Sequence, residues 1–334
     1  MRCSQQCYSA QRRRRLGAAK GLPTGSSTTP NVLSGTWDFK WPIGTKLRLA
    51  FQRLPRDVAG FDFAFEEARA LVLDKFEQWV GGKAGVERPN ITFAVVTDMP
   101  APPLHPLGSP RNAKSDTRFT GFIEYDVLVS FLPLPLLLPA TEQHAEEVLS
   151  TSVSELGRYA QRIEYGVPTV YLGPQPGLTA SQWFGSAEGL FTVVHELGHV
   201  LGMPHEQQNP LLSELPWRPV AEMLEILEKR DGGVGDENLG EVLRSEITDP
   251  WPGEVRFSDW RSPPPNLQNG LESVMARPLY RCLLHGGHAD GLDCRGLTQC
   301  PHEQQGFKEL QSPTPGDLKH LLAMYGTAVH RVHP

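Results

Sequence analysis

The segment from Leu190 to Leu201 constrains the fold most strongly, because it is apolar almost all round and yet contains three titratable side chains. A helix of this composition is buried within its domain, since no face of it favours water. His195, Glu196 and His199 nevertheless lie on it. Buried polar side chains cost free energy unless a partner satisfies them. We therefore expect a buried helix whose histidines have a strong partner, and a metal ion is such a partner.

The spacing of the histidines indicates that they share one metal ion. His195 and His199 are four residues apart, so on a helix they project from the same face about one turn apart. Gly202 can adopt a left-handed conformation, which ends the helix and turns the chain so that His205 reaches the same metal. Three neutral imidazoles and one water form a catalytic zinc site with an open position. The sequence therefore predicts one Zn2+ held by His195, His199 and His205.

Glu196 lies beside the predicted metal without having to ligate it. A zinc ion lowers the pKa of its bound water to about 7, and a neighbouring carboxylate can take the proton. The same carboxylate can later deliver that proton to a leaving group. One alternative is that the buried histidines only bond to backbone groups. Chance is a weak explanation, because five fixed positions of the motif seldom have the right residue types by coincidence. The residues alone predict a zinc hydrolase with Glu196 as general base.

Hydrophobic patterns elsewhere predict a mixed α/β layer in the first half of the chain. Alternating or continuous apolar runs are typical of strands, and apolar residues at helical spacing are typical of amphipathic helices. The predicted strands are residues 45–51, 91–96, 125–131 and 168–172, and the predicted helices are residues 61–80, 145–159, 220–230 and 315–325. The most apolar segment, residues 127–140, is too short and too rich in proline to cross a bilayer, so no transmembrane segment is expected.

The pattern from His195 to Glu206 resembles the metzincin metallopeptidases, and Glu206 followed by Gln207 resembles their astacin branch. In that family a methionine occupies a tight turn beneath the zinc, well downstream of the histidines. The sequence Ser-Val-Met ending at Met275 is similar to this turn. The resemblance therefore implies that Met275 is the structural methionine of the turn.

This resemblance covers roughly residues 37–330 and implies an α+β, zincin-like fold. The implied N-terminal lobe, about residues 35–205, contains a mixed twisted sheet and the active-site helix. The implied C-terminal lobe, about residues 206–330, is irregular, and a zinc cleft lies between the lobes. Residues 35–334 would then form one catalytic domain. The implied activity is that of a monomeric zinc metalloendopeptidase acting on protein or peptide substrates.

The strand predicted near residue 170 looks like the edge strand that borders the cleft of metzincins. Such a strand can hold an extended substrate by strand addition, through backbone hydrogen bonds that do not depend on side chains. The resemblance therefore implies that the substrate lies along Thr169, Val170, Tyr171, Leu172 and Gly173.

The chain departs from the astacin pattern after Met275. Astacins have His-Tyr at the next two positions, and that tyrosine can reach the zinc, whereas this chain has Ala276 and Arg277. Tyr280 comes three residues late, and it can act as a fifth ligand or support the transition state if the turn is rearranged. The alternative function is a zinc-binding pseudopeptidase that holds peptides or proteins without cleaving them, although the intact Glu196 argues against it. A third possibility is a metal-stabilised interaction protein whose N-terminal tail makes the contacts.

That tail, residues 1–34, is rich in Arg, Ser, Thr, Gly and Gln and is predicted to be disordered. Its first 20 residues contain six Lys or Arg and no Asp or Glu, so the rest of the chain is more acidic than the net charge of −6 indicates. An acidic body gives no expectation of nucleic-acid binding. No signal peptide is recognised, whereas the resemblance favours secretion, so the sequence leaves the compartment open.

A second cluster of metal-ligating residue types lies near the C-terminus. It consists of Cys282, His285, His288, Cys294, Cys300 and His302. The spacings match no standard zinc finger, so a second, structural zinc ion is not expected. A disulfide in an inserted loop and free thiols are the alternatives that the sequence leaves open.

Overall fold

The computed structural model describes residues 40–54, 64–81, 87–100, 124–132, 152–154, 157–162, 166, 168–175, 178–203, 205–206, 217–230, 273–276, 282–284, 292–293, 295, 297 and 300–327. These residues form two compact units. The larger unit contains a five-stranded sheet and most of the helices, and the smaller unit is built around one helix.

The sheet of the larger unit is mostly parallel. Its strands are β1 (Lys46–Gln52), β2 (Thr92–Val95), β3 (Val127–Ser130), β4 (Ser152–Ser154) and β5 (Val170–Leu172), and their order is β2-β1-β3-β5-β4. Every pairing is parallel except that of β4, which runs antiparallel to β5. All residues of β3 are buried, as expected for a parallel strand that is covered on both faces.

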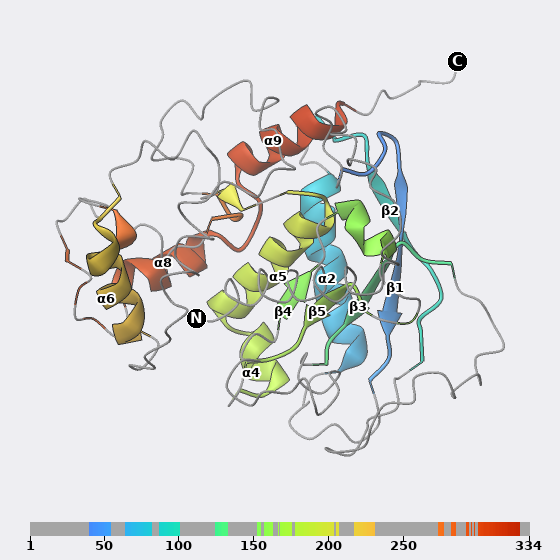
Figure 1. The fold of residues 1–334 in the computed structure, drawn as a ribbon. Helices are drawn as coiled ribbons and strands as arrows, with labels where there is room; N and C mark the ends of the chain where they lie inside the picture. The colour runs from blue at the N-terminus through green and yellow to red at the C-terminus, as the bar shows by residue number, and fades with distance from the viewer. Residues whose placement is uncertain are drawn as a thin grey trace, which may run out of the picture. The chain divides into compact units, whose positions relative to one another are not determined.

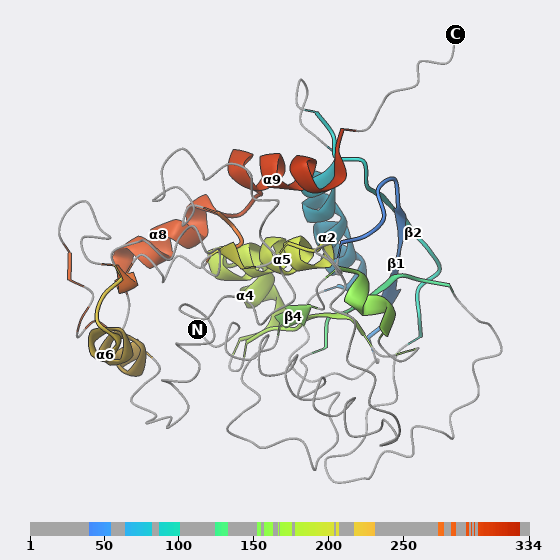
Figure 2. The same ribbon diagram turned by 45° about the horizontal axis from the view of Figure 1, so that its top comes forward.

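Two long helices lie side by side against one face of this sheet (Figures 1 and 2). They are α2 (Phe65–Val80) and α5 (Ala187–Val200), and the indole Nε1 of Trp79 donates to the carbonyl of Val194 at 3.0 Å. Phe76 of α2 contacts Phe93 of β2 edge-on, with ring centroids 4.9 Å apart. The shorter elements of this unit are η1 (Gly157–Arg162), α4 (Ala180–Phe184) and α9 (Pro315–Tyr325). The predicted mixed α/β architecture, with its four strands and buried helix, is therefore confirmed.

The smaller unit is built around α6 (Val220–Arg230). Arg218 precedes this helix and ties it to a neighbouring segment, because its backbone N–H donates to Leu283 at 2.9 Å and its Nε donates to the carbonyl of Cys282 at 3.1 Å. Its guanidinium also pairs with Glu222, one turn into α6, at 3.1 Å. A further helix, α8, spans Pro301–Glu309.

Two expectations about the sheet are wrong. Residues 152–154, placed in a helix by their local pattern, form β4, because their backbone pairs with β5 in the register Ser152↔Leu172 and Ser154↔Val170. Residues 170–172 form a strand as predicted, but it is not an edge strand, since β3 and β4 pair with its two sides. Its residues are 0–3% exposed, which suits an interior strand. The edge beyond β5 is formed by β4.

Among the described residues, no helix is both long enough and apolar enough to span a bilayer.

His320 on α9 gives the fold a dependence on pH that can be measured. Burial lowers the pKa of His320 from 6.5 to about 4. Between these values the unfolded chain binds a proton that the folded chain does not, so the free energy of unfolding decreases as pH falls through this window. Replacing His320 with Gln should remove roughly 1–3 kcal/mol of this decrease. Urea unfolding of both proteins at pH 7 and pH 4.5 measures the difference, and identical pH slopes would contradict the assignment to His320.

Candidate metal centre

Helix α5 carries three of its four titratable side chains into the core of the larger unit. His195, Glu196 and His199 are 1%, 0% and 4% exposed. The helix begins at Ser186, whose Oγ accepts the Gly189 N–H at 2.9 Å and so satisfies one of the unpaired donors of the first turn. The helix therefore has a defined start, and the position of each ligand along it is fixed.

The end of α5 is equally well defined, and it is closed by a Schellman motif. Gly202 has a φ of +85°, its N–H donates to the carbonyl of His199 at 2.8 Å, and the Met203 N–H donates to Gly198 at 3.0 Å. A left-handed φ strains any residue with a Cβ, which is why glycine occupies this position. The predicted role of Gly202 in ending the helix and turning the chain is confirmed.

Two side chains from distant parts of the sequence satisfy carbonyls at the same helix end. Trp41 Nε1 donates to the carbonyl of Val200 at 2.8 Å, and the Tyr325 hydroxyl donates to that of Leu201 at 2.7 Å. Burial raises the pKa of Tyr325, so its hydroxyl keeps the proton that it donates. The residues before β1 and at the end of α9 thus hold the last turn of α5 in place.

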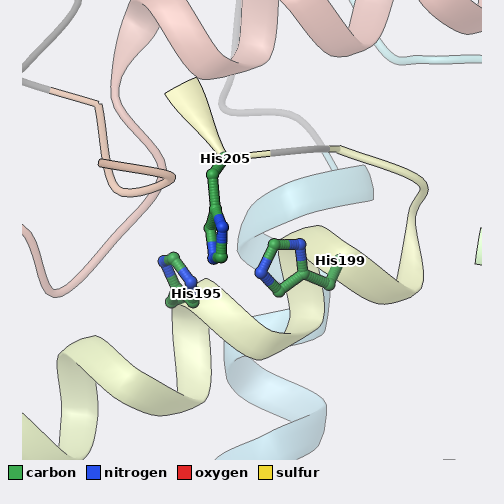
Figure 3. A group of neighbouring side chains, drawn as sticks. All are labelled: His195, His199 and His205. Atoms are coloured by element: carbon green, nitrogen blue, oxygen red, sulfur yellow. The ribbon is translucent and has the colours of Figure 1, made fainter. Parts of the chain in front are cut away.

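The structure brings together the three predicted ligands. His195, His199 and His205 each offer one ligand atom, and these atoms all lie within 4.8 Å of one another. The rings point toward one another, with the first two projecting from α5 and the third from the chain that follows the turn (Figure 3). Within the part of the chain that the structure describes, this is the one group of three or more His, Cys, Asp or Glu side chains that could hold a metal ion.

Backbone carbonyls fix the orientation of two of the rings. His195 Nδ1 lies 2.8 Å from the carbonyl of Val274, and His199 Nδ1 lies 2.7 Å from that of Met203. A carbonyl can only accept, so each Nδ1 carries the proton and the lone pair of each ring is on Nε2. This is the arrangement in which metal-ligating histidines are normally held by their outer partners.

The carbonyl that orients His195 belongs to a turn that is itself held by α9. Asp317 accepts the Val274 N–H at 3.1 Å, accepts a hydrogen bond from the Ser273 hydroxyl, and accepts the Thr314 N–H at 2.8 Å. The last bond belongs to the capping box that starts α9. One buried carboxylate therefore joins a helix start to the turn that orients a ligand ring.

Met275 lies in the same turn and packs against α5. A Cβ at Gly198 would lie 2.2 Å from the Met275 Sδ and 3.0 Å from the Trp79 ring. The absence of a side chain at Gly198, between the two histidines of the helix, is what lets the thioether approach. Met275 is 0% exposed.

Glu196 is held from the sheet. The Ser154 Oγ in β4 donates to Glu196 Oε2 at 2.7 Å and also lies 3.0 Å from the Glu196 carbonyl oxygen. No local pattern in the sequence signals this contact, because Ser154 is 42 residues away and lies in a segment predicted to be helical.

The other residues singled out in the sequence either make contacts elsewhere in the described structure or lie outside the described residues. Thr169–Gly173 contains the interior strand β5, and Thr169 Oγ1 bonds to the backbone of Leu128 in β3. Tyr280 lies outside the described residues. Cys282 and Cys300 are buried and form no disulfide among the described residues, and the other members of their cluster fall partly outside the described residues.

No protein-family model matches the chain, and no curated protein matches it. Two solved structures of myroilysin match it at 16% sequence identity. One has a TM-score of 0.47 and covers 87% of this chain and 97% of its own, and the other has a TM-score of 0.39 and covers 92% and 100%. Likenesses this distant establish neither family nor activity, so the chemistry of the site rests on the residues of this chain.

Because Gly198 contacts Met275, replacing this glycine with alanine should lower the free energy of unfolding, although Gly→Ala in a helix usually raises it. Gly→Ala inside a helix normally stabilises by up to about 1 kcal/mol. Replacing Gly198 with Ala should instead destabilise by roughly 1–3 kcal/mol, because the methyl group overpacks against the thioether. The matched control is Gly316→Ala in α9, where a Cβ meets only the Thr314 Oγ1 within 4 Å, at 3.6 Å, and which should be neutral or stabilising. Urea unfolding measures both, and a stabilised Gly198→Ala protein would contradict the packing.

Proposed function

We propose that this chain is a zinc-dependent metalloendopeptidase. The observation that carries the proposal is the group of three buried histidines, two of which have their Nδ1 protons engaged by backbone carbonyls. Their Nε2 lone pairs are thereby left to face a shared ion. The burial of three converging imidazoles, two of them on an apolar helix, favours a shared ligand.

The donor set fits zinc. Three imidazole nitrogens suit zinc, which is intermediate between hard and soft metal ions. Three protein ligands leave the fourth coordination position open, as in catalytic rather than structural zinc sites. When bound, zinc supplies a Lewis acid and lowers the pKa of a coordinated water toward neutrality. His195, His199 and His205 would be the ligands, and Met275 would support the site from below as the methionine of a metzincin-type turn.

Glu196 is the proposed general base and acid. It follows His195 directly in the sequence and is fully buried, so its carboxylate is shielded from solvent. It would take a proton from the attacking water and then transfer it to the amine of the cleaved peptide bond. The intact carboxylate favours an active enzyme over a pseudopeptidase with the same ligands.

The outer strand of the described sheet is the proposed place for the substrate backbone. β4 is the terminal strand in the order of the described strands, and its Ser154 contacts Glu196. An extended peptide that paired with β4 would pass close to the proposed base, and its backbone bonds would not depend on sequence. A protein or peptide is therefore the proposed substrate class, and the astacin-like subtype stays part of this proposal.

Metal analysis tests the ligand set directly. The full-length protein should bind one zinc ion, and His205→Ala should lose it because two imidazoles do not complete the site. His302→Gln, a histidine of α8 outside the group, is the control and should keep its zinc. Zinc at 100 times its dissociation constant should stabilise the metal-stripped parent by about 2.7 kcal/mol. Full zinc content in His205→Ala would contradict this site.

Hydrolysis of casein and of a quenched peptide library tests the base. Glu196→Ala should keep its zinc and lose about 10²–10⁴-fold in kcat, because it removes the proton acceptor but no ligand. Glu188→Ala is the matched control, since Glu188 lies on the same helix and accepts from Gln175 Nε2 at 3.0 Å. Zinc binding without chelator-sensitive cleavage in the parent would favour the pseudopeptidase instead.

A further inference from the structure

The position of Ser154 is set by the sheet rather than by the helix that it contacts. β4 pairs antiparallel with β5, with Ser154 opposite Val170, and β5 pairs in turn with β3. These backbone ladders fix where the Ser154 side chain leaves the strand. The residue is 2% exposed, so water does not compete freely for its hydroxyl.

The Ser154 hydroxyl touches both the side chain and the backbone of one residue. Its Oγ lies 2.7 Å from Glu196 Oε2 and 3.0 Å from the Glu196 carbonyl oxygen. A hydroxyl has one proton, and the shorter distance together with the charge of the carboxylate favours Oε2 as the main acceptor. Because of the longer contact the hydrogen bond is bifurcated. The Ser154 hydroxyl thus bridges the carboxylate and the backbone carbonyl of Glu196.

The rotational freedom of Glu196 gives this contact its importance. A glutamate has several rotatable bonds, and a base works only while its oxygen lies within hydrogen-bond reach of the proton that it takes. A donor on Oε2 restricts the rotation of the carboxylate and favours one orientation. Reactions of this kind lose rate steeply when a reacting group is displaced by about 1 Å.

We propose that Ser154 is a positioning residue, which holds the carboxylate of Glu196 in its working orientation from the edge strand of the sheet. This inference rests on the proposed function, because it needs Glu196 to act as the base. Ser154 keeps its proton on Oγ throughout and takes no part in bond making. The sheet and the base are thereby joined by one side-chain hydrogen bond.

Kinetics of the zinc-loaded, full-length protein test the proposal. Ser154→Ala should lower kcat by about ten- to a hundredfold with KM nearly unchanged, because the substrate still binds while the base is less often in position. Ser154→Thr keeps a hydroxyl and suits a strand, so it should recover most of the loss. The matched control is Ser130→Ala in β3, which removes another buried serine whose Oγ accepts the Leu132 N–H at 3.3 Å and which should leave kcat unchanged.

A second measurement does not depend on activity. The melting temperature of Ser154→Ala should fall in the parent background and fall less in a Glu196→Ala background, because the hydrogen bond is then already lost. Zinc content should be one per chain in every variant. This cycle decides the matter even if the added methyl group of Ser154→Thr is not tolerated in the buried strand.

The outcomes separate this inference from the proposed function. Full activity in Glu196→Ala would remove the base, and with it the role of Ser154. Loss of activity in Glu196→Ala with parental kcat in Ser154→Ala would leave the proposed function standing and overturn the positioning role. Equal melting shifts in the two backgrounds, or a kcat loss in Ser154→Ala that follows loss of zinc, would also overturn it.

Discussion

The burial of polar side chains on α5 is the constraint on which the rest of the structure depends. Imidazoles and a carboxylate in an apolar core are costly unless each has a specific partner, and the chain supplies these partners from several directions. His195 is held by the carbonyl of Val274, His199 by that of Met203, and Glu196 by the hydroxyl of Ser154. The surrounding elements are arranged so that all three partner groups contact α5.

The helix and the approach of its two histidines to His205 could be predicted from the sequence, because their signals are local. Helix geometry alone places His195 and His199 on one face, because they are four residues apart. Gly202 indicates the turn that follows, because a residue with a Cβ is strained at its φ of +85°. These patterns are local, so they can be recognised without knowledge of the tertiary structure. The strands of the parallel sheet were predictable for the same reason, since buried strands are continuous apolar runs.

The supporting contacts could not be predicted, because they join residues that are far apart in the chain. Ser154 and Glu196 are separated by 42 residues, His195 and Val274 by 79, and Trp41 and Val200 by 159. The mistaken edge strand has a related cause. A short apolar strand reads the same in the interior and at the edge of a sheet, and the true edge, β4, was hidden because a three-residue strand has too short a pattern to outweigh its helical surroundings.

The hydrogen bonds of Asp317 determine how late in synthesis the histidine group can be aligned. The ring of His195 is oriented by residue 274, and that turn is anchored by a carboxylate at the start of α9. During synthesis the helix with two of the histidines leaves the ribosome long before either of these supports exists. The group of histidines therefore acquires its final geometry only after the first turn of α9 has been translated, and a nascent or truncated chain carries these histidines without their alignment.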